Sequence, residues 1–138
     1  MAKKPEPKTR PTDVDPQDFL NEIKDATKRQ DSIELLEMMR SVTRLKPVMW
    51  GGAIIGFGSK PIKYANGSEL DWPMMAFSPR KASLTLYLQD FPEFDEMLRE
   101  LGPNARSKGC LYIKRLSDID IKILKQLLTA SFKSAIAS

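Results

Sequence analysis

Histidine is absent from this chain of 138 residues, and cysteine occurs once, at Cys110. Without histidine, the usual general base, the commonest zinc ligand and the His-dependent catalytic triads are missing. A single cysteine also excludes an internal disulfide framework and a structural zinc site built from Cys/His clusters. An enzyme is therefore disfavoured, because its catalytic site would need Lys, Tyr, Asp and Glu alone.

Long apolar runs are missing as well. No run of about 18 apolar residues is present that could span a bilayer, and no apolar core follows the N-terminal lysines as it does in a signal peptide. A lone cysteine fits a reducing compartment. We therefore expect a cytoplasmic protein with no membrane partner.

Positive charge is concentrated at the start of the chain. The net charge is +4, and residues 1–10 carry four cations against one acid, so the rest of the chain is only about +1. This low charge disfavours nucleic acid as a partner of the folded part.

The length predicts one domain. Residues 1–14 contain three prolines, mixed charges and no apolar period, which predicts a disordered basic leader. Residues 15–138 then form the single domain.

Capping residues followed by apolar stripes with helical spacing predict four helices. The expected helices begin at Asp15, at Asp31 or Ser32, at Asp90 and at Ser117. The second ends before Pro47, because a residue that precedes proline avoids the helical conformation.

Short runs rich in β-branched, aromatic or alternating apolar residues predict about five strands. They cover residues 53–57, 62–64, 74–77, 83–88 and 110–114. The expected order is α-α-β-β-β-β-α-β-α. Strands joined by short connections imply an antiparallel sheet with helices packed on one face, an α+β domain.

Three stretches resemble a known family: WGGAIIGFGSKPIKY, FSPRKASLTLYL and LGPNARSKGCLYIKRLSDIDIKILKQLL. They are similar to the signature blocks of the YdhG-like family, a bacterial domain-of-unknown-function family, and the resemblance covers roughly residues 23–128. It implies a frataxin-like two-layer sandwich, and one member is described as a frataxin-like iron chaperone. The loop before Gly109 departs from the lysine-rich pattern of many relatives, which weakens any anion site built from it.

Alternation along two strands predicts a polar and aromatic sheet face. Leu84 and Leu86 share one side of their strand, so Thr85 and Tyr87 share the other. Together with the resemblance, this gives the candidate ligand-binding residues Trp50, Tyr64, Phe77, Lys81, Thr85, Tyr87, Tyr112 and Lys114. The expected function is a non-enzymatic binding module for an anionic small molecule or a protein partner. The alternative is an ordinary solvated sheet face, where Thr, Tyr and Lys are favoured in any case.

An acidic group around the first helix gives an alternative metal site. Asp18, Glu22 and Asp25 supply oxygen ligands that could hold iron weakly, as an iron chaperone would require. The competing interpretation is a solvated helix face whose acids favour the helix dipole. No other cofactor is expected.

Two remaining features have structural interpretations. Cys110 is expected to be a half-buried structural thiol, because no histidine can activate it. The glycines at 51, 52, 56 and 58 lack the spacing of a nucleotide-binding loop, so they are expected to allow a bend or close packing by Trp50. An unpaired edge strand leaves a monomer and a weak homodimer both open.

Overall fold

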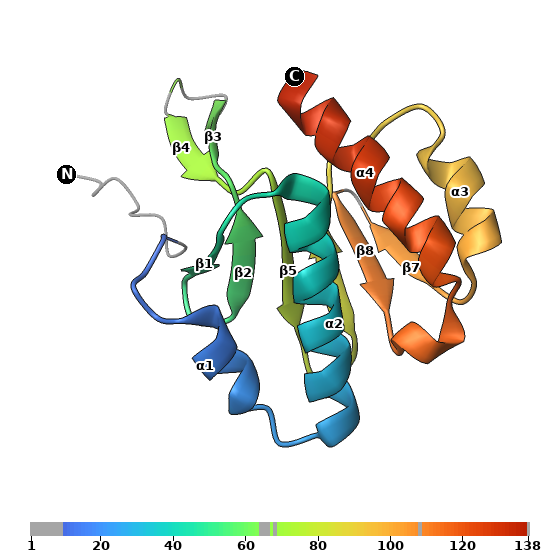
Figure 1. Ribbon diagram of the computed structural model, residues 1–138. Coiled ribbons are helices and arrows are strands. Elements are labelled where there is room, and N and C mark those ends of the chain that lie inside the picture. Colours follow the sequence, from blue (N-terminus) through green and yellow to red (C-terminus); the bar gives the residue numbers. More distant parts are fainter. Residues whose placement is uncertain (1–9, 64–66, 68, 108, 138) are drawn as a thin grey trace.

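The computed structural model describes residues 10–63, 67, 69–107 and 109–137, which form an α+β fold (Figure 1). The helices are α1 (Pro16–Asn21), α2 (Ala26–Thr43), α3 (Phe94–Leu101) and α4 (Ile121–Ala137), with a 3₁₀ turn at Leu116–Asp118. The strands are β1 (Pro47–Trp50), β2 (Ile54–Phe57), β3 (Lys60–Lys63), β4 (Glu69–Trp72), β5 (Met75–Pro79), β6 (Leu84–Tyr87), β7 (Ala105–Ser107) and β8 (Cys110–Ile113). None of the helices in the described ranges combines the length and apolar character needed to cross a bilayer.

Six of the strands form one antiparallel sheet in the order β1-β2-β5-β6-β8-β7, and β3 and β4 pair as a separate hairpin. Helices α2 and α4 lie side by side across one face of this sheet, and α3 packs alongside α4 (Figure 1). The predicted fold class is confirmed at this level.

The core lies between the sheet and the helices. Direct pairing across the strands places one row of side chains on the helix-covered face, and each is at most 1% exposed: Met49, Ile55, Phe77, Leu86 and Leu111. From the helices, the fully buried residues of this core include Leu35, Met39, Leu124 and Leu128. Burial of this apolar area is the main source of stability.

Helix α2 begins earlier than the sequence suggested. The carboxylate of Asp25 accepts hydrogen bonds from the backbone N–H groups of Thr27 (2.9 Å) and Lys28 (3.0 Å), so Asp25 is the N-cap. The expected start at Asp31 or Ser32 is wrong, because both residues lie inside α2. Asp25, Asp31 and Ser32 are all residue types that cap helices well, so the local sequence does not show which of them begins the helix.

The other two helix starts also shift. Helix α3 begins at Phe94 rather than at Asp90, after a turn in which the Phe94 N–H donates to the Phe91 carbonyl. Ser117, expected to cap the last helix, lies inside the 3₁₀ turn Leu116–Asp118. Helix α4 then begins where the Asp120 carboxylate accepts from the N–H groups of the next turn, at 2.9 and 3.3 Å.

Three strands were not predicted: β1, β4 and β7. Strand β1 opens with a proline, and β7 is a three-residue edge strand whose side chains carry no apolar pattern. Strand β4 alternates exposed and half-buried residues, a pattern that is readable in the sequence. Strands β1 and β7 join the main sheet, whereas β3, which was expected in it, pairs with β4 in the separate hairpin. The main sheet therefore has six strands instead of about five.

Residues 10–14, which we call the N-terminal segment, differ from the disordered leader that was expected over residues 1–14. Residues 1–9 lie outside the described part. The N–H of Thr12 donates to the carbonyl of Met49 and the N–H of Gly51 donates to the carbonyl of Arg10, both at 2.8 Å. Pro11 bridges Trp50 in antiparallel fashion. The segment satisfies backbone groups that the outer edge of β1 would otherwise leave unpaired.

Candidate functional site

A row of aromatic rings lies on the sheet face opposite the helices. The Trp50 and Trp72 rings are 6.4 Å apart, and Trp72 meets Tyr87 edge-on at 6.0 Å. A Cβ added to Gly56 would lie 2.7 Å from both Trp50 Cδ1 and Pro73 Cβ. Glycine at this position therefore lets the indole lie directly on the sheet, which agrees with the expectation that a glycine allows close packing by Trp50.

Beside this row, β6 and β8 present what we call the open face: Thr85, Tyr87, Cys110 and Tyr112. Cross-strand pairing joins Thr85 to Tyr112 and Tyr87 to Cys110, so the four side chains share one side of the sheet. The tyrosines and Cys110 are half-buried, and Thr85 is buried between them. The Tyr112 hydroxyl lies 2.8 Å from the hydroxyl of Ser107 on β7, which fixes the direction of the ring.

Cations gather where β5 ends, β6 begins and β8 ends. Leu84 pairs with both Pro79 and Ile113, so the β5–β6 turn lies beside the residues that follow β8. We call the resulting group the basic end of the sheet: Lys28, Arg80, Lys81, Lys114 and Arg115. It adjoins the open face, because Lys114 directly follows Ile113, the last residue of β8, two positions beyond Tyr112.

Helix α2 fixes the basic end in place. The ammonium group of Lys28 donates to the backbone carbonyls of Arg80 (2.6 Å) and Lys81 (2.9 Å). Arg115 Nε lies 4.0 Å from the carboxylate of Asp31. The side chains of Lys81 and Lys114 are exposed, and within the described part of the chain neither forms an ion pair. These two cations are therefore available to a ligand.

The predicted site residues do not all meet. Thr85, Tyr87 and Tyr112 share the face that alternation indicated. Lys114 directly follows the end of β8, and Lys81 lies in the β5–β6 turn. Tyr64 lies outside the described residues. Trp50 is on the same side of the sheet but only 3% exposed, so it supports the neighbouring side chains and offers almost no surface to a ligand.

Phe77 does not belong to the site. It pairs with Ile55 and Leu86 in the helix-covered row and is fully buried. Its assignment as a ligand-binding residue is wrong. Phe77 was a candidate through the family resemblance alone. Alternation along β5 gives no direction that could have excluded it, because both faces of this strand are buried.

Arg106, which the sequence suggested lies in the loop before Gly109, is in β7 and is engaged within the protein. Its guanidinium pairs with Asp90 and Asp95 and lies 4.1 Å from the centroid of the Phe94 ring. These contacts attach the edge strand β7 to α3. The arginine is therefore not available for a ligand anion on the open face.

The acidic residues proposed for iron have other surroundings. Asp18 is in α1, Glu22 ends that helix, and Asp25 caps α2. Across the described residues, no group of three or more His, Cys, Asp or Glu side chains could hold a metal ion. Nothing in this region favours the iron alternative.

The capping role of Asp25 predicts a pH dependence. The pKa of Asp25 lies below its ordinary value, mainly because its carboxylate accepts a hydrogen bond from the N–H of Lys28. Desolvation opposes this lowering, whereas the N–H of Thr27 and the charges of Lys28 and Arg115 add to it. A lowered folded-state pKa contributes stability above the unfolded value of about 3.9, and the contribution disappears as pH falls through the folded value. Asp25→Asn keeps a capping oxygen but cannot titrate.

We therefore expect the unfolding free energies of the wild type and Asp25→Asn to converge as pH falls. Urea denaturation from about pH 7 to about pH 2.5 measures this, and the difference between the two proteins isolates Asp25 from other carboxyls. Parallel curves through the acid range would show that the charge on Asp25 does not contribute.

Sequence reasoning missed Lys28, Arg80 and Trp72. Lys28 reaches a turn 52 residues further along the chain, which no local pattern indicates. Arg80 precedes Lys81 in a tight turn, where its N–H donates to the carbonyls of Ser78 and Ser83 at 3.0 Å. The consecutive basic residues Arg80 and Lys81 were the sequence signal that could have identified this turn. Trp72 was missed together with strand β4.

Comparison with known proteins adds no relative. No family model matches the chain, and searches of the curated proteins and of the solved structures find no match either. The function is therefore inferred from the site itself.

Proposed function

We propose that this protein is a non-enzymatic binding module that holds an anionic ligand at the basic end of the sheet and on the adjoining open face. The observation that carries the proposal is the meeting of the Arg80–Lys81 turn with Lys114 and Arg115 beside half-buried Tyr112. The ligand is a small anion or an acidic segment of a protein partner, since both present the same charge to these cations.

The chemistry of the surface fits such a ligand. Lys81 and Lys114 supply ammonium donors for carboxylate or phosphate oxygens. Tyr87 and Tyr112 offer ring surface and hydroxyl groups next to them. Because Lys28 holds the turn through its carbonyls, the cations are positioned before the ligand arrives, which reduces the entropy lost on binding.

The same proposal includes membership of the YdhG-like family, a frataxin-like arrangement and a cytoplasmic location. The three signature-like stretches support the family assignment. An antiparallel sheet with its helices on one face is compatible with that arrangement. The single cysteine supports a reducing compartment.

Calorimetric titration with inorganic pyrophosphate and with a short glutamate peptide tests the proposal and separates the two ligand sources. We expect one of the two to bind the wild type, and Lys81→Ala with Lys114→Ala to weaken that binding at least about tenfold, the loss of roughly one charge-assisted contact. Lys122→Ala with Lys133→Ala removes the same charge from exposed positions on α4 and should leave affinity unchanged.

Equal weakening by both pairs of substitutions would indicate a general charge effect and would contradict a defined site. Failure of the wild type to bind either probe at low salt would overturn the anionic ligand altogether.

A further inference from the structure

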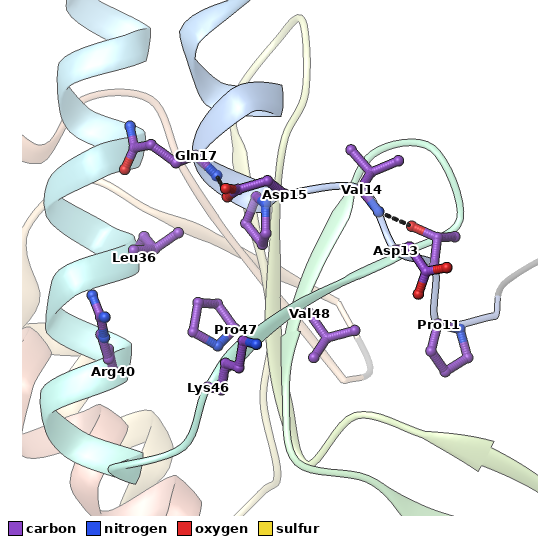
Figure 2. Close-up of a pocket in the computed structure, with 12 residues that line it drawn as sticks. Pro11, Asp13, Val14, Asp15, Gln17, Leu36, Arg40, Lys46, Pro47 and Val48 are labelled. Carbon is purple, nitrogen blue, oxygen red and sulfur yellow. Dashed lines mark hydrogen bonds between the residues drawn. The ribbon is translucent and has the colours of Figure 1, made fainter.

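A pocket of about 670 Å³ lies between the N-terminal segment, α2 and the start of β1 (Figure 2). It is at the β1 edge of the sheet, on a different part of the molecule from the β5–β6 turn. Its volume falls within the range of about 300–1,000 Å³ typical of small-molecule sites.

The outer wall of this pocket is built from the N-terminal segment. Thr12 is bonded to β1 through its backbone N–H, and its hydroxyl accepts from the N–H of Val14 at 3.3 Å. Asp15 then caps α1 by accepting from the N–H of Gln17 at 2.8 Å. The pocket is therefore formed in the free protein, which favours ligand binding.

The lining combines an apolar surface with two cations and two carboxylates, one of which, Asp15, accepts the hydrogen bond from the N–H of Gln17. Leu36, Pro47 and Val48 contribute apolar surface, and Val14 is 54% exposed, unusually open for a valine. Figure 2 shows the side chains of Arg40 and Lys46 on the Pro47 side of the pocket.

Asp13 lies on the opposite side, near Pro11 (Figure 2). A negative group bound near the cations would thus be some distance from this carboxylate. A second negative group at the far end of a ligand would approach it.

The two cations are available to a ligand. Arg40 pairs with Glu37 at 3.1 Å, but both side chains are more than half exposed, and such pairs contribute little stability. Lys46 forms no ion pair within the ranges that the structure describes.

We propose that this pocket binds a small organic monocarboxylate with an apolar body. The carboxylate accepts hydrogen bonds from Arg40 and Lys46, and the body packs on Leu36, Pro47 and Val48. Asp13 selects against a second carboxylate at the other end, since like charges within a pocket repel.

Three probes of equal chain length test the charge requirement: octanoate, the neutral 1-octanol and the dicarboxylate suberate. Binding is followed through the backbone amide signals of ¹⁵N-labelled full-length protein. We expect octanoate to shift the signals of Val14, Arg40 and Val48, and to bind at least about fivefold more tightly than octanol or suberate.

Two sets of substitutions locate the effect. Arg40→Gln with Lys46→Gln should weaken octanoate about tenfold and leave octanol unchanged, whereas Asp13→Asn should strengthen suberate. Arg44→Gln with Lys125→Gln removes the same charge around a separate groove between α2 and α4 and should change nothing.

Equal affinity for octanoate and octanol would overturn the proposal, as would octanoate shifts centred on the α2–α4 groove. All these positions are exposed, and an unchanged amide spectrum of each variant confirms that it folds. The result is independent of the pyrophosphate titration, because the two sites share no residue.

Discussion

Replacing Phe77 by alanine is expected to lower the free energy of unfolding by about 3–5 kcal/mol. Phe77 is fully buried between Ile55 and Leu86 in the row that faces the helices. Truncation would leave a cavity beneath α2 that this packed core could only partly close. Urea denaturation followed by circular dichroism measures the change.

A comparison of leucine substitutions separates a core role from a ligand-binding role. Phe77→Leu should cost more stability than Tyr112→Leu, because Tyr112 is only half-buried on the open face. Phe77→Leu should leave anion binding unchanged, and Tyr112→Leu should weaken it. If Phe77→Ala cost less than about 1 kcal/mol, the assigned register of β5 would be wrong.

Gly56→Ala is expected to destabilise the protein by about 1–3 kcal/mol, although it adds a single methyl group. That carbon would lie 2.7 Å from both Pro73 Cβ and Trp50 Cδ1. Trp50 has little freedom to move away, because it is 3% exposed and packs against Trp72. The added carbon would therefore displace the indole or bend β2.

Gly52→Ala is the matched control, since a Cβ at that position meets nothing within 4 Å. We expect its unfolding free energy to stay within about 0.5 kcal/mol of the wild type. Equal effects of the two substitutions would show that contact with Trp50 does not set the cost. A further consequence is expected at the site: displacement of Trp50 should reach Tyr87 through Trp72, which contacts both rings.

The sequence was most informative where alternation was clean. Leu84 and Leu86 pointed one way and Thr85 and Tyr87 the other, so the open face was correctly located before the register was known. No such alternation was available for Phe77, which the family resemblance alone suggested, because its strand is buried on both faces. Hydrophobic alternation shows which way the side chains of a strand point only where one face of the sheet is exposed to solvent.

Contacts between distant residues could not be predicted. Lys28 and the turn it supports are separated by 52 residues in the chain, and the N-terminal segment is paired with β1 through backbone groups that any sequence carries. Helix α2 shows a different limit. Asp25 and Asp31 are both good caps, and Asp31 is instead used inside the helix, where it accepts from the N–H of Leu116 at 3.1 Å.

The most direct test of the proposed binding function is to map backbone amide shifts of the wild-type protein during titration with pyrophosphate and with the glutamate peptide. We expect the signals moved by whichever probe binds to be those of residues 80–85 and 111–115, together with that of Lys28. Shifts centred elsewhere, or no shifts with either probe at low salt, would contradict an anion site at the basic end of the sheet.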